Sequence, residues 1–198
     1  MKDIGYMMDI ILRYIQDTGF YMLLVMPIIL IVRYLHIKRF KVQTSFLHEL
    51  GLVIFFMILT GLLSQTILPT IYSSQGEVKF INGDHRAINL ELFRVFGETY
   101  NAIKFLDLWQ PLLINFVGNI VMFMPIGFFL PLLWGKFNRA WRSVGMGFLV
   151  SLVIEVVQLT QMRSSDVDDL LLNTFGTSIG YVLYKALSKT FRDSFKIR

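Results

Sequence analysis

The stretch SLVIEVVQLTQMRSSDVDDLLLNTFGTSIG, residues 151–180, consists of two apolar segments joined by a short acidic turn. Glu155 lies inside the first apolar segment, and Asn173 lies inside the second. Each of these polar side chains is costly in hydrocarbon if it stays unpaired, so a membrane protein keeps it only where it is paired or functional. We therefore expect the rest of the chain to bring partners to this segment.

The composition of the whole chain places it among membrane proteins. Of its 198 residues, 55% are hydrophobic and 17% are charged, whereas soluble domains are about 45–50% apolar and about 25% charged. The chain contains no cysteine, which excludes a disulfide framework and a thiolate metal site. The net charge of +5 follows the loops between apolar blocks, so it does not indicate a nucleic-acid partner.

Five apolar blocks are each close to the roughly 20 residues that a helix needs to cross a bilayer. They are residues 19–35, 46–68, 112–134, 144–161 and 169–187. Apolar residues in 1–17 lie on one helical face, which predicts either a short helix on the membrane or an extension of the first span. Pro125 and Pro131 predict a kink or an unwound segment in the third block. The sequence thus predicts an all-α integral membrane protein, one domain over residues 1–198 with a bundle of about five transmembrane helices.

The long polar connection between the second and third blocks has strand-like features. Residues 77–81 alternate polar and apolar side chains, Asn82-Gly83 is typical of a tight turn, and residues 87–95 partly resume the alternation. Two such runs around an Asn-Gly pair favour a β-hairpin. We expect a small extracellular hairpin with its turn at Asn82-Gly83.

The distribution of basic residues predicts the orientation. Lys and Arg are concentrated in the last turns of the first and fifth blocks and in the segments that follow the first, third and fifth blocks, including Arg33, Lys38, Arg39, Lys41, Lys136, Arg139, Arg142 and Lys185. Short loops rich in Lys and Arg stay in the cytoplasm. The N-terminus and the acidic turn are therefore expected outside, and the C-terminus in the cytoplasm. If the first block instead lay in the interface, four spans would remain and the N-terminal segment would be inside, but the acidic turn would still face outward.

Polar side chains of several spans fall at similar depths. At a rise of 1.5 Å per residue, Glu155 and Asn119 lie roughly 10 Å from the outer end of their blocks, and Asn173 lies roughly 7 Å from it. A carboxylate inside a span is a functional-site hypothesis by default. We predict an outward-facing polar pocket. Its candidate ligand-binding residues are Asn119, Glu155, Gln158, Arg163, Asp166, Asp168, Asp169 and Asn173.

Some polar residues have a structural interpretation instead. Four of them are expected to bond neighbouring helices, as such residues do in membranes: Asn115, Ser64, Gln65 and Thr177. Gly176 and Gly180 form a GxxxG pair, which predicts close helix packing. One acid of the turn would suffice as a helix N-cap, whereas this turn has three beside an Arg. For Glu155 the structural alternative is a protonated acid, or one paired with Arg163.

The spacing of these residues resembles the signature of the VanZ-like membrane proteins. The matching elements are Asn119-x3-Phe123-x-Pro125-x-Gly127-Phe128, Glu155-x2-Gln158, Arg163-x2-Asp166-x-Asp168-Asp169 and Asn173-x2-Gly176-x3-Gly180. Asn89-Leu90 with Phe93 resembles the element before them, although Glu91-Leu92 stands where a Pro often precedes the aromatic residue. The resemblance covers the chain from Asn89 onward. It implies a multi-pass protein of the bacterial cell membrane, in a family whose founding members are linked to low-level teicoplanin resistance.

Three functions agree with this pattern. The first is a cell-envelope protein that contributes to teicoplanin-type resistance by binding a lipid head group, a lipid-linked envelope precursor or the lipoglycopeptide. Arg163 would then meet a phosphate or carboxylate, and the acids would meet amines or hydroxyls. The second is an enzyme acting on a lipid-linked phosphate or sugar, with Mg²⁺ or Ca²⁺ held by carboxylates or with Glu155 as general base. Its catalytic residues would be Glu155, Asp166, Asp168 and Asp169.

The third function is a lipid transporter or scramblase, against which five spans without an internal repeat argue. The motif region contains no His, no P-loop and no nucleophile elbow. The sequence therefore predicts no cofactor beyond the metal ion of the second hypothesis.

Overall fold

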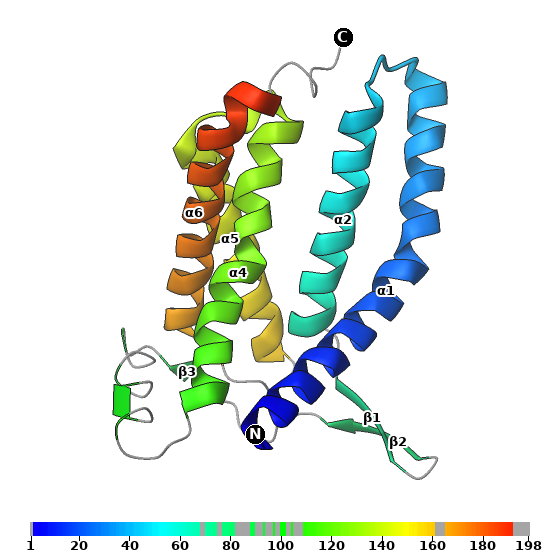
Figure 1. Ribbon diagram of the computed structural model, residues 1–198. Coiled ribbons are helices and arrows are strands. Elements are labelled where there is room, and N and C mark those ends of the chain that lie inside the picture. Colours follow the sequence, from blue (N-terminus) through cyan, green and yellow to red (C-terminus); the bar gives the residue numbers. More distant parts are fainter. Residues whose placement is uncertain are drawn as a thin grey trace.

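The computed structural model describes residues 2–67, 70–74, 77–81, 88–89, 93, 97, 100–101, 104, 109–160 and 165–191. Its long helices are α1 (Lys2–Phe40), α2 (Phe46–Thr66), α4 (Trp109–Leu133), α5 (Ala140–Thr160) and α6 (Val167–Phe191). The helices form two groups, α1 with α2 and α4 with α5 and α6 (Figure 1). A short 3₁₀ helix, η2 (Gly135–Phe137), joins α4 to α5. The predicted all-α class is confirmed.

Four of the described helices contain a stretch that is long and apolar enough to cross a membrane. These stretches are Thr18–Phe40, Phe46–Thr66, Phe116–Leu133 and Ala140–Leu159. Large apolar side chains on α1 are uncovered by protein, as for Leu23, which is 69% exposed. A continuous apolar surface of this kind marks contact with a membrane. The chain is a multi-pass membrane protein, while a crossing by residues 169–187 stays a prediction because α6 is not among these four stretches.

Helix α1 is continuous from Lys2 to Phe40. Of the two interpretations of residues 1–17, this helix favours the extension of the first span. Its 39 residues make it about 58 Å long at 1.5 Å per residue, nearly twice the roughly 30 Å of a hydrocarbon core. The helix changes direction along its length (Figure 1). It contains Pro27, which cannot donate to the carbonyl of Leu23, a common cause of such a bend.

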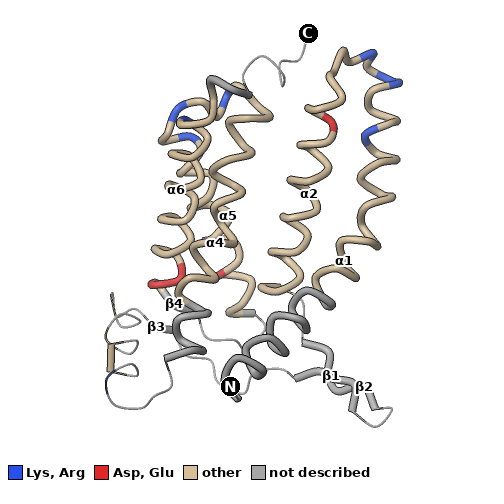
Figure 2. The backbone as a smooth tube through the Cα atoms, viewed as in Figure 1, with Lys and Arg blue, Asp and Glu red and all other residues tan. Residues whose placement is uncertain are grey.

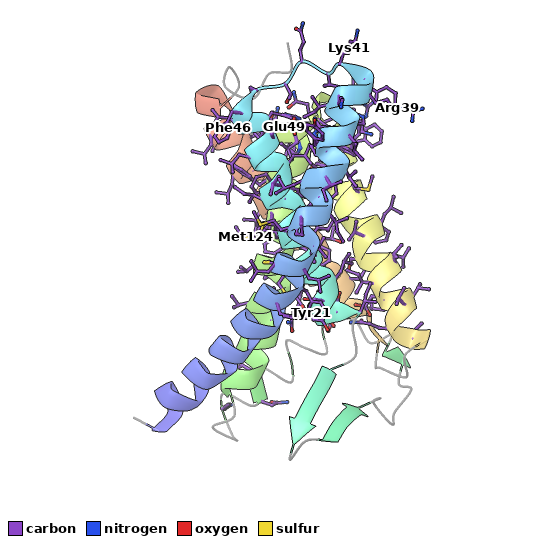
Figure 3. The ribbon with its side chains drawn as sticks, turned by 90° about the vertical axis from the view of Figure 1, so that its right-hand side faces the viewer. Tyr21, Arg39, Lys41, Phe46, Glu49 and Met124 are labelled. Carbon is purple, nitrogen blue, oxygen red and sulfur yellow. The ribbon has the colours of Figure 1, made fainter. Side chains whose placement is uncertain are left out.

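Polar contacts near both ends of α2 hold it to α1. Arg33 makes a two-pronged ion pair with Glu49, Nε to Oε2 at 2.6 Å and Nη2 to Oε1 at 2.8 Å. At the opposite end, Gln65 Nε2 donates to Thr18 Oγ1 at 2.8 Å. Figure 3 shows Glu49 at the same end of the helix pair as Arg39 and Lys41, with Tyr21 toward the other end. The second contact confirms that Gln65 bonds a neighbouring helix.

The apolar core lies where α2, α4 and α5 meet. Its buried residues include Leu52 and Phe55 of α2, Phe123 and Ile126 of α4, and Ile154 of α5. The rings of Phe55 and Trp134 meet edge to face, with centroids 5.7 Å apart. This cluster joins the α1–α2 pair to the other three helices.

Glycines let α4 and α6 approach until their backbones touch. A Cβ atom at any of three glycines would overlap a carbonyl oxygen of the facing helix: Gly176 against Ile120, Gly180 against Met124, and Gly127 against Thr177. The side chain of Thr177 in turn fills the space above Gly147 of α5. The close packing predicted from the GxxxG pair is confirmed.

The two prolines of α4 do not interrupt it. The helix runs unbroken from Trp109 to Leu133, so the predicted unwound segment is wrong, while the alternative of a kink stays a prediction. A proline leaves the carbonyl four residues before it without a helical donor. For Pro131 this carbonyl belongs to Gly127, and the Ser143 hydroxyl of α5 donates to it at 3.4 Å. The neighbouring helix thus replaces one of the lost hydrogen bonds.

The strands differ from the predicted hairpin. Strands β1 (Thr70–Ser74) and β2 (Glu77–Ile81) pair antiparallel, and β3 (Ile88–Asn89) pairs parallel with β4 (Ser165–Asp166). The strand at 77–81 is present as β2, but it pairs with β1, the strand before it in the sequence, and not with a strand after it. Only two residues separate β1 from β2. The predicted partner at 87–95 contains β3, which pairs elsewhere. Asn82-Gly83 lies outside the described residues.

Charges are segregated along the bundle. Figure 2 shows Lys and Arg gathered at one end, near the C-terminus, and the acids of α5 and α6 toward the other end. Glu49, in the first turn of α2, lies at the basic end. We refer below to the end that carries Lys136 and Lys185 as the basic end, and to the end that carries Glu155 and Asp168 as the acidic end.

Candidate functional site

The connection after α2 reaches the acidic turn between α5 and α6. Ile88 pairs with Ser165 and Asn89 with Asp166, in parallel register. The backbone N–H of Phe93 donates to Asp168 Oδ1 at 2.7 Å, across 75 residues of sequence. Asp168 lies in the first turn of α6 and is only 1% exposed. The acidic turn is therefore completed by the segment that contains Asn89 and Phe93.

Phe93 adopts an unusual backbone conformation at this contact. Its φ angle is +68°, a left-handed conformation that costs a residue with a bulky side chain on the order of 1–3 kcal/mol. The hydrogen bond to the buried Asp168 carboxylate offsets part of this cost, since bonds to charged acceptors are the stronger ones. The sequence pattern does not single out Asn89 or Phe93 as ligand-binding residues, although both belong to the family-like element that precedes the motif.

Asn119 and Asp169 link α4 to α6. The Asn119 Nδ2 donates to Asp169 Oδ1 at 2.6 Å, and both side chains are partly buried. Adjacent acids of one turn thus face different partners: Asp168 faces the connection after α2, and Asp169 faces α4. The structure thus brings Asn119 to Asp169 and the Phe93 backbone to Asp168.

Asn173 and Glu155 lie in the contact between α5 and α6. Asn173 Nδ2 donates to Ser151 Oγ at 2.9 Å, and the two residues are 4% and 0% exposed. Ser151 precedes Glu155 by four residues, so both lie on one face of α5, and Glu155 is 7% exposed. Asn173 Oδ1 is buried and has no hydrogen-bond partner among the described atoms. Ser151 was not a candidate, although its helical spacing from Glu155 was a usable signal.

Of the three remaining candidates, Gln158 bonds a different helix, Asp166 is described only by its backbone, and Arg163 is not described. Gln158 Nε2 donates to the carbonyl of Thr66 at the end of α2, at 3.1 Å. It therefore ties α5 to α2, and among the described residues it makes no bond to the acidic turn. Asp166 is described through its backbone pairing in β4, and Arg163 lies outside the described residues.

The predicted interhelical bonds are corrected at two positions. Ser64 Oγ donates to the Gly61 carbonyl, and Thr177 Oγ1 donates to the Asn173 carbonyl, each within its own helix. A hydroxyl near its own backbone reaches a carbonyl three or four residues back, so it needs no partner on another helix. The side chain of Asn115 is not described.

The described polar side chains of the acidic end mainly present oxygen atoms that accept hydrogen bonds. Carboxylates of Glu155, Asp168 and Asp169 and the amide of Asn173 lie in the first turns of α6 and the last turns of α5. Such oxygens bind ammonium groups, hydroxyls or hard cations. Among the side chains that the structure describes, no three His, Asp or Glu residues come close enough to hold a metal ion together.

No curated protein and no solved structure matches this chain at a significant level. A sequence model of one protein family, described as VanZ/LLP1, matches residues 50–188, from the first turns of α2 to near the end of α6. The match thus begins earlier than the motif resemblance, which started at Asn89. Because it covers well over half of the chain, this protein belongs to the VanZ/LLP1 family.

Proposed function

We propose that this protein binds the polar head group of a lipid or other amphiphile at its acidic end and thereby contributes to tolerance of teicoplanin-type lipoglycopeptides. The observation that carries the proposal is the burial of Glu155 and Asn173 in the α5–α6 contact, with Asn173 Oδ1 unpartnered among the described atoms. A buried acceptor without a donor costs about 1–3 kcal/mol. Helix packing alone would be served better by an apolar side chain.

The acceptor chemistry supports a ligand rich in donors. Ammonium groups and sugar hydroxyls are the donors that carboxylates and amide oxygens bind, and both occur in lipid head groups and glycopeptides. Arg163 would bind a phosphate or carboxylate of the same ligand. This assignment combines a cationic and an anionic group, as in a zwitterionic head group or a lipid-linked envelope precursor.

The proposal places the acidic end on the outer side of the membrane. The basic end would then face the cytoplasm, in keeping with the preference of Lys- and Arg-rich loops for that side. A pocket on the outer side meets lipoglycopeptides directly, because these amphiphiles act from outside the cell membrane.

Growth in the presence of teicoplanin tests the proposal. We expect Glu155→Gln and Asp168→Asn to lose the protection that the native protein gives, because both keep the shape of the side chain and remove its charge. Asp168→Asn retains an oxygen that can accept from the Phe93 N–H. The matched control is Val156→Ala, since Val156 neighbours Glu155 and is 53% exposed on the lipid side of α5. Immunoblots of membrane fractions measure abundance in parallel.

Full protection by both charge-neutral variants at native abundance would refute the role of these carboxylates. Lost protection with lost protein would assign them to folding instead. Mass spectrometry of the purified protein provides the direct measurement: the native chain and Val156→Ala should retain an amphiphile that Glu155→Gln does not.

A further inference from the structure

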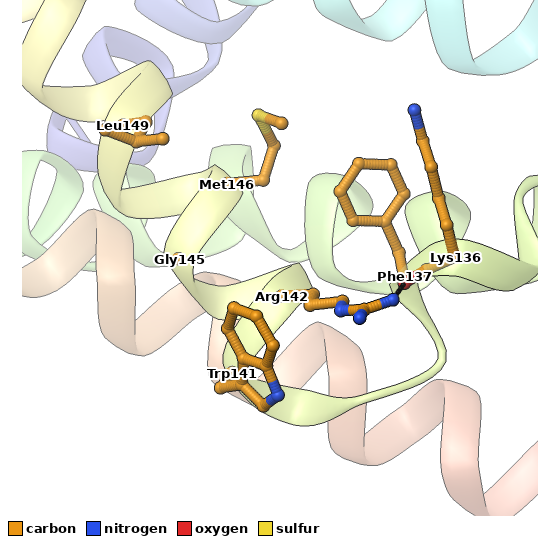
Figure 4. A pocket seen from close by; sticks show the side chains of 7 residues that line it. All are labelled: Lys136, Phe137, Trp141, Arg142, Gly145, Met146 and Leu149. Atoms are coloured by element: carbon orange, nitrogen blue, oxygen red, sulfur yellow. Dashed lines mark hydrogen bonds between the residues drawn. The ribbon is translucent and has the colours of Figure 1, made fainter.

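A groove lies at the opposite end of the molecule from the candidate site. It is formed by η2 and the first turns of α5 and has a volume of about 620 Å³ (Figure 4). Its lining residues are Lys136, Phe137, Trp141, Arg142, Gly145, Met146 and Leu149. The volume falls within the range of about 300–1,000 Å³ that small-ligand sites occupy.

Two cations border this groove, and the structure holds one of them in place. Arg142 Nη1 donates to the carbonyl of Lys136 at 3.0 Å, the dashed bond in Figure 4. The Arg142 guanidinium also lies 5.1 Å from the centre of the Trp141 ring. A guanidinium has five N–H donors, so the bond to Lys136 leaves most of them for a ligand.

The described part of the chain supplies no acid to these cations. The sequence has no Asp or Glu between Asp107 and Glu155. Glu155 lies 13 residues beyond Arg142 along α5, which is about 20 Å at the helical rise. On the facing helix α2, Glu49 is already paired with Arg33. The two cations of the groove thus have no ion-pair partner among the described residues.

The apolar wall of the groove extends from the cations into the membrane span. Gly145, Met146 and Leu149 follow Arg142 along α5, and they lie within the apolar stretch Ala140–Leu159. From Arg142 to Leu149 the helix advances about 10 Å. Trp141 is 67% exposed and Leu149 is 53% exposed, so protein does not cover this wall. Exposed Trp residues are frequent where a span meets the membrane surface.

We propose that this groove binds an anionic phospholipid, with its phosphodiester at Lys136 and Arg142 and an acyl chain along Gly145, Met146 and Leu149. The order of cations and apolar side chains along α5 matches the order of head group and chain in a lipid. Two cations without an acid nearby among the described residues favour a head group with net negative charge over a zwitterionic one, whose ammonium would find no described partner. This inference is independent of the function proposed for the acidic end.

Fluorescence quenching of Trp141 tests the assignment. The chain has three Trp residues, so replacing Trp109 and Trp134 by Phe leaves Trp141 as the only reporter. The protein is reconstituted into phosphatidylcholine bilayers that contain a minor fraction of either phosphatidylglycerol or phosphatidylcholine with brominated acyl chains. Brominated phosphatidylglycerol is expected to quench more, because each cation near an anionic lipid contributes about fivefold to its local enrichment.

Two variants and one control separate the groove from general surface charge. Lys136→Gln with Arg142→Gln should remove the preference for phosphatidylglycerol. Gly145→Leu should reduce quenching by both lipids while keeping the cations, because a Cβ at Gly145 meets nothing within 4 Å and the larger side chain can occupy the groove. The control, Lys38→Gln with Arg39→Gln, removes two cations from the same end outside the groove and should keep the preference.

Equal quenching by the two brominated lipids in the parent protein would overturn the proposal. The same loss of preference in the Lys38→Gln, Arg39→Gln control would also overturn it, because diffuse charge would then explain the effect. If the single-Trp background fails to fold, native mass spectrometry of the otherwise unaltered protein replaces it. Phosphatidylglycerol should then be retained by the parent and by the control, and lost from the Lys136→Gln, Arg142→Gln protein; retention by all three would refute the site.

Discussion

At the scale of single residues, the lack of a Cβ atom at Gly127 allows α4 and α6 to pack closely. Gly127 faces the Thr177 carbonyl of α6, and a Cβ there would overlap it. Because the obstacle is backbone, the helices themselves would have to separate. We expect Gly127→Ala to lower the free energy of unfolding by at least the 1–3 kcal/mol or so that overpacking costs.

The same helix provides the control for this prediction. Gly118 also lies in α4, but a Cβ there meets nothing within 4 Å. Gly118→Ala should therefore be neutral or stabilise the helix by up to about 1 kcal/mol, the usual gain in helix propensity. Thermal unfolding in detergent measures both. Equal melting temperatures for the two variants would contradict the close approach of α4 and α6.

Residue types showed which side chains matter, but the sequence did not show their partners. A polar side chain within an apolar segment is costly unless it is paired or has a function. On this basis the sequence singles out Glu155 and Asn173, and both are buried. Gln158 met the same criterion, yet it bonds the Thr66 carbonyl. Which way a helical side chain points depends on the rotation of the helix in the bundle, and only neighbouring helices determine that rotation.

At the scale of elements, the Arg33–Glu49 pair connects α1 to the rest of the molecule. Its side chains are 18% and 21% exposed, and Glu49 also accepts from Thr44 Oγ1 at 2.6 Å. Arg33→Gln leaves a partly buried carboxylate without its cation, and Glu49→Gln leaves the guanidinium without its anion. The destabilisations of the two single variants should add up to about 0.5–3 kcal/mol more than that of the double variant, which is the coupling expected of contacting residues. Additive effects in the cycle would show that the pair contributes nothing to stability.

The elements themselves were largely predictable, whereas the pairing of short strands was not. Apolar blocks of about bilayer length located α2, α4, α5 and α6 within a few residues, whereas α1 begins at Lys2, well before the predicted block 19–35. Alternation located a strand at 77–81, but alternation carries no information about the partner. Strands β3 and β4 have two residues each, which is too few to show an alternation of polar and apolar residues in the sequence.

At the scale of the whole molecule, the orientation and the crossing of α6 can be tested together. Helix α6 has the same length as α4 and packs along it (Figure 1). We therefore expect α6 to cross the membrane despite its charged ends. The chain contains no Cys, so single Cys substitutions at Ser165 and Ser188 report on the two ends of α6.

In whole cells, an impermeant thiol reagent should label Ser165→Cys and should label Ser188→Cys only after permeabilisation. The basis is the preference of Lys- and Arg-rich segments for the cytoplasm. Labelling of Ser188→Cys alone would invert the orientation. Labelling of both would mean that α6 returns to the side from which it starts.

The hydrogen bond from the Phe93 N–H to Asp168 has a consequence for the synthesis and membrane insertion of the protein. The Phe93 N–H is synthesised 75 residues before the carboxylate that accepts its hydrogen bond. At about 5–20 residues per second the ribosome needs roughly 4–15 s to reach Asp168. Until then the N–H cannot make its native hydrogen bond, so we expect the segment around Phe93 to stay outside the hydrocarbon while α4 and α5 enter it. The acidic end is therefore completed last, once the beginning of the final helix has left the ribosome and docked.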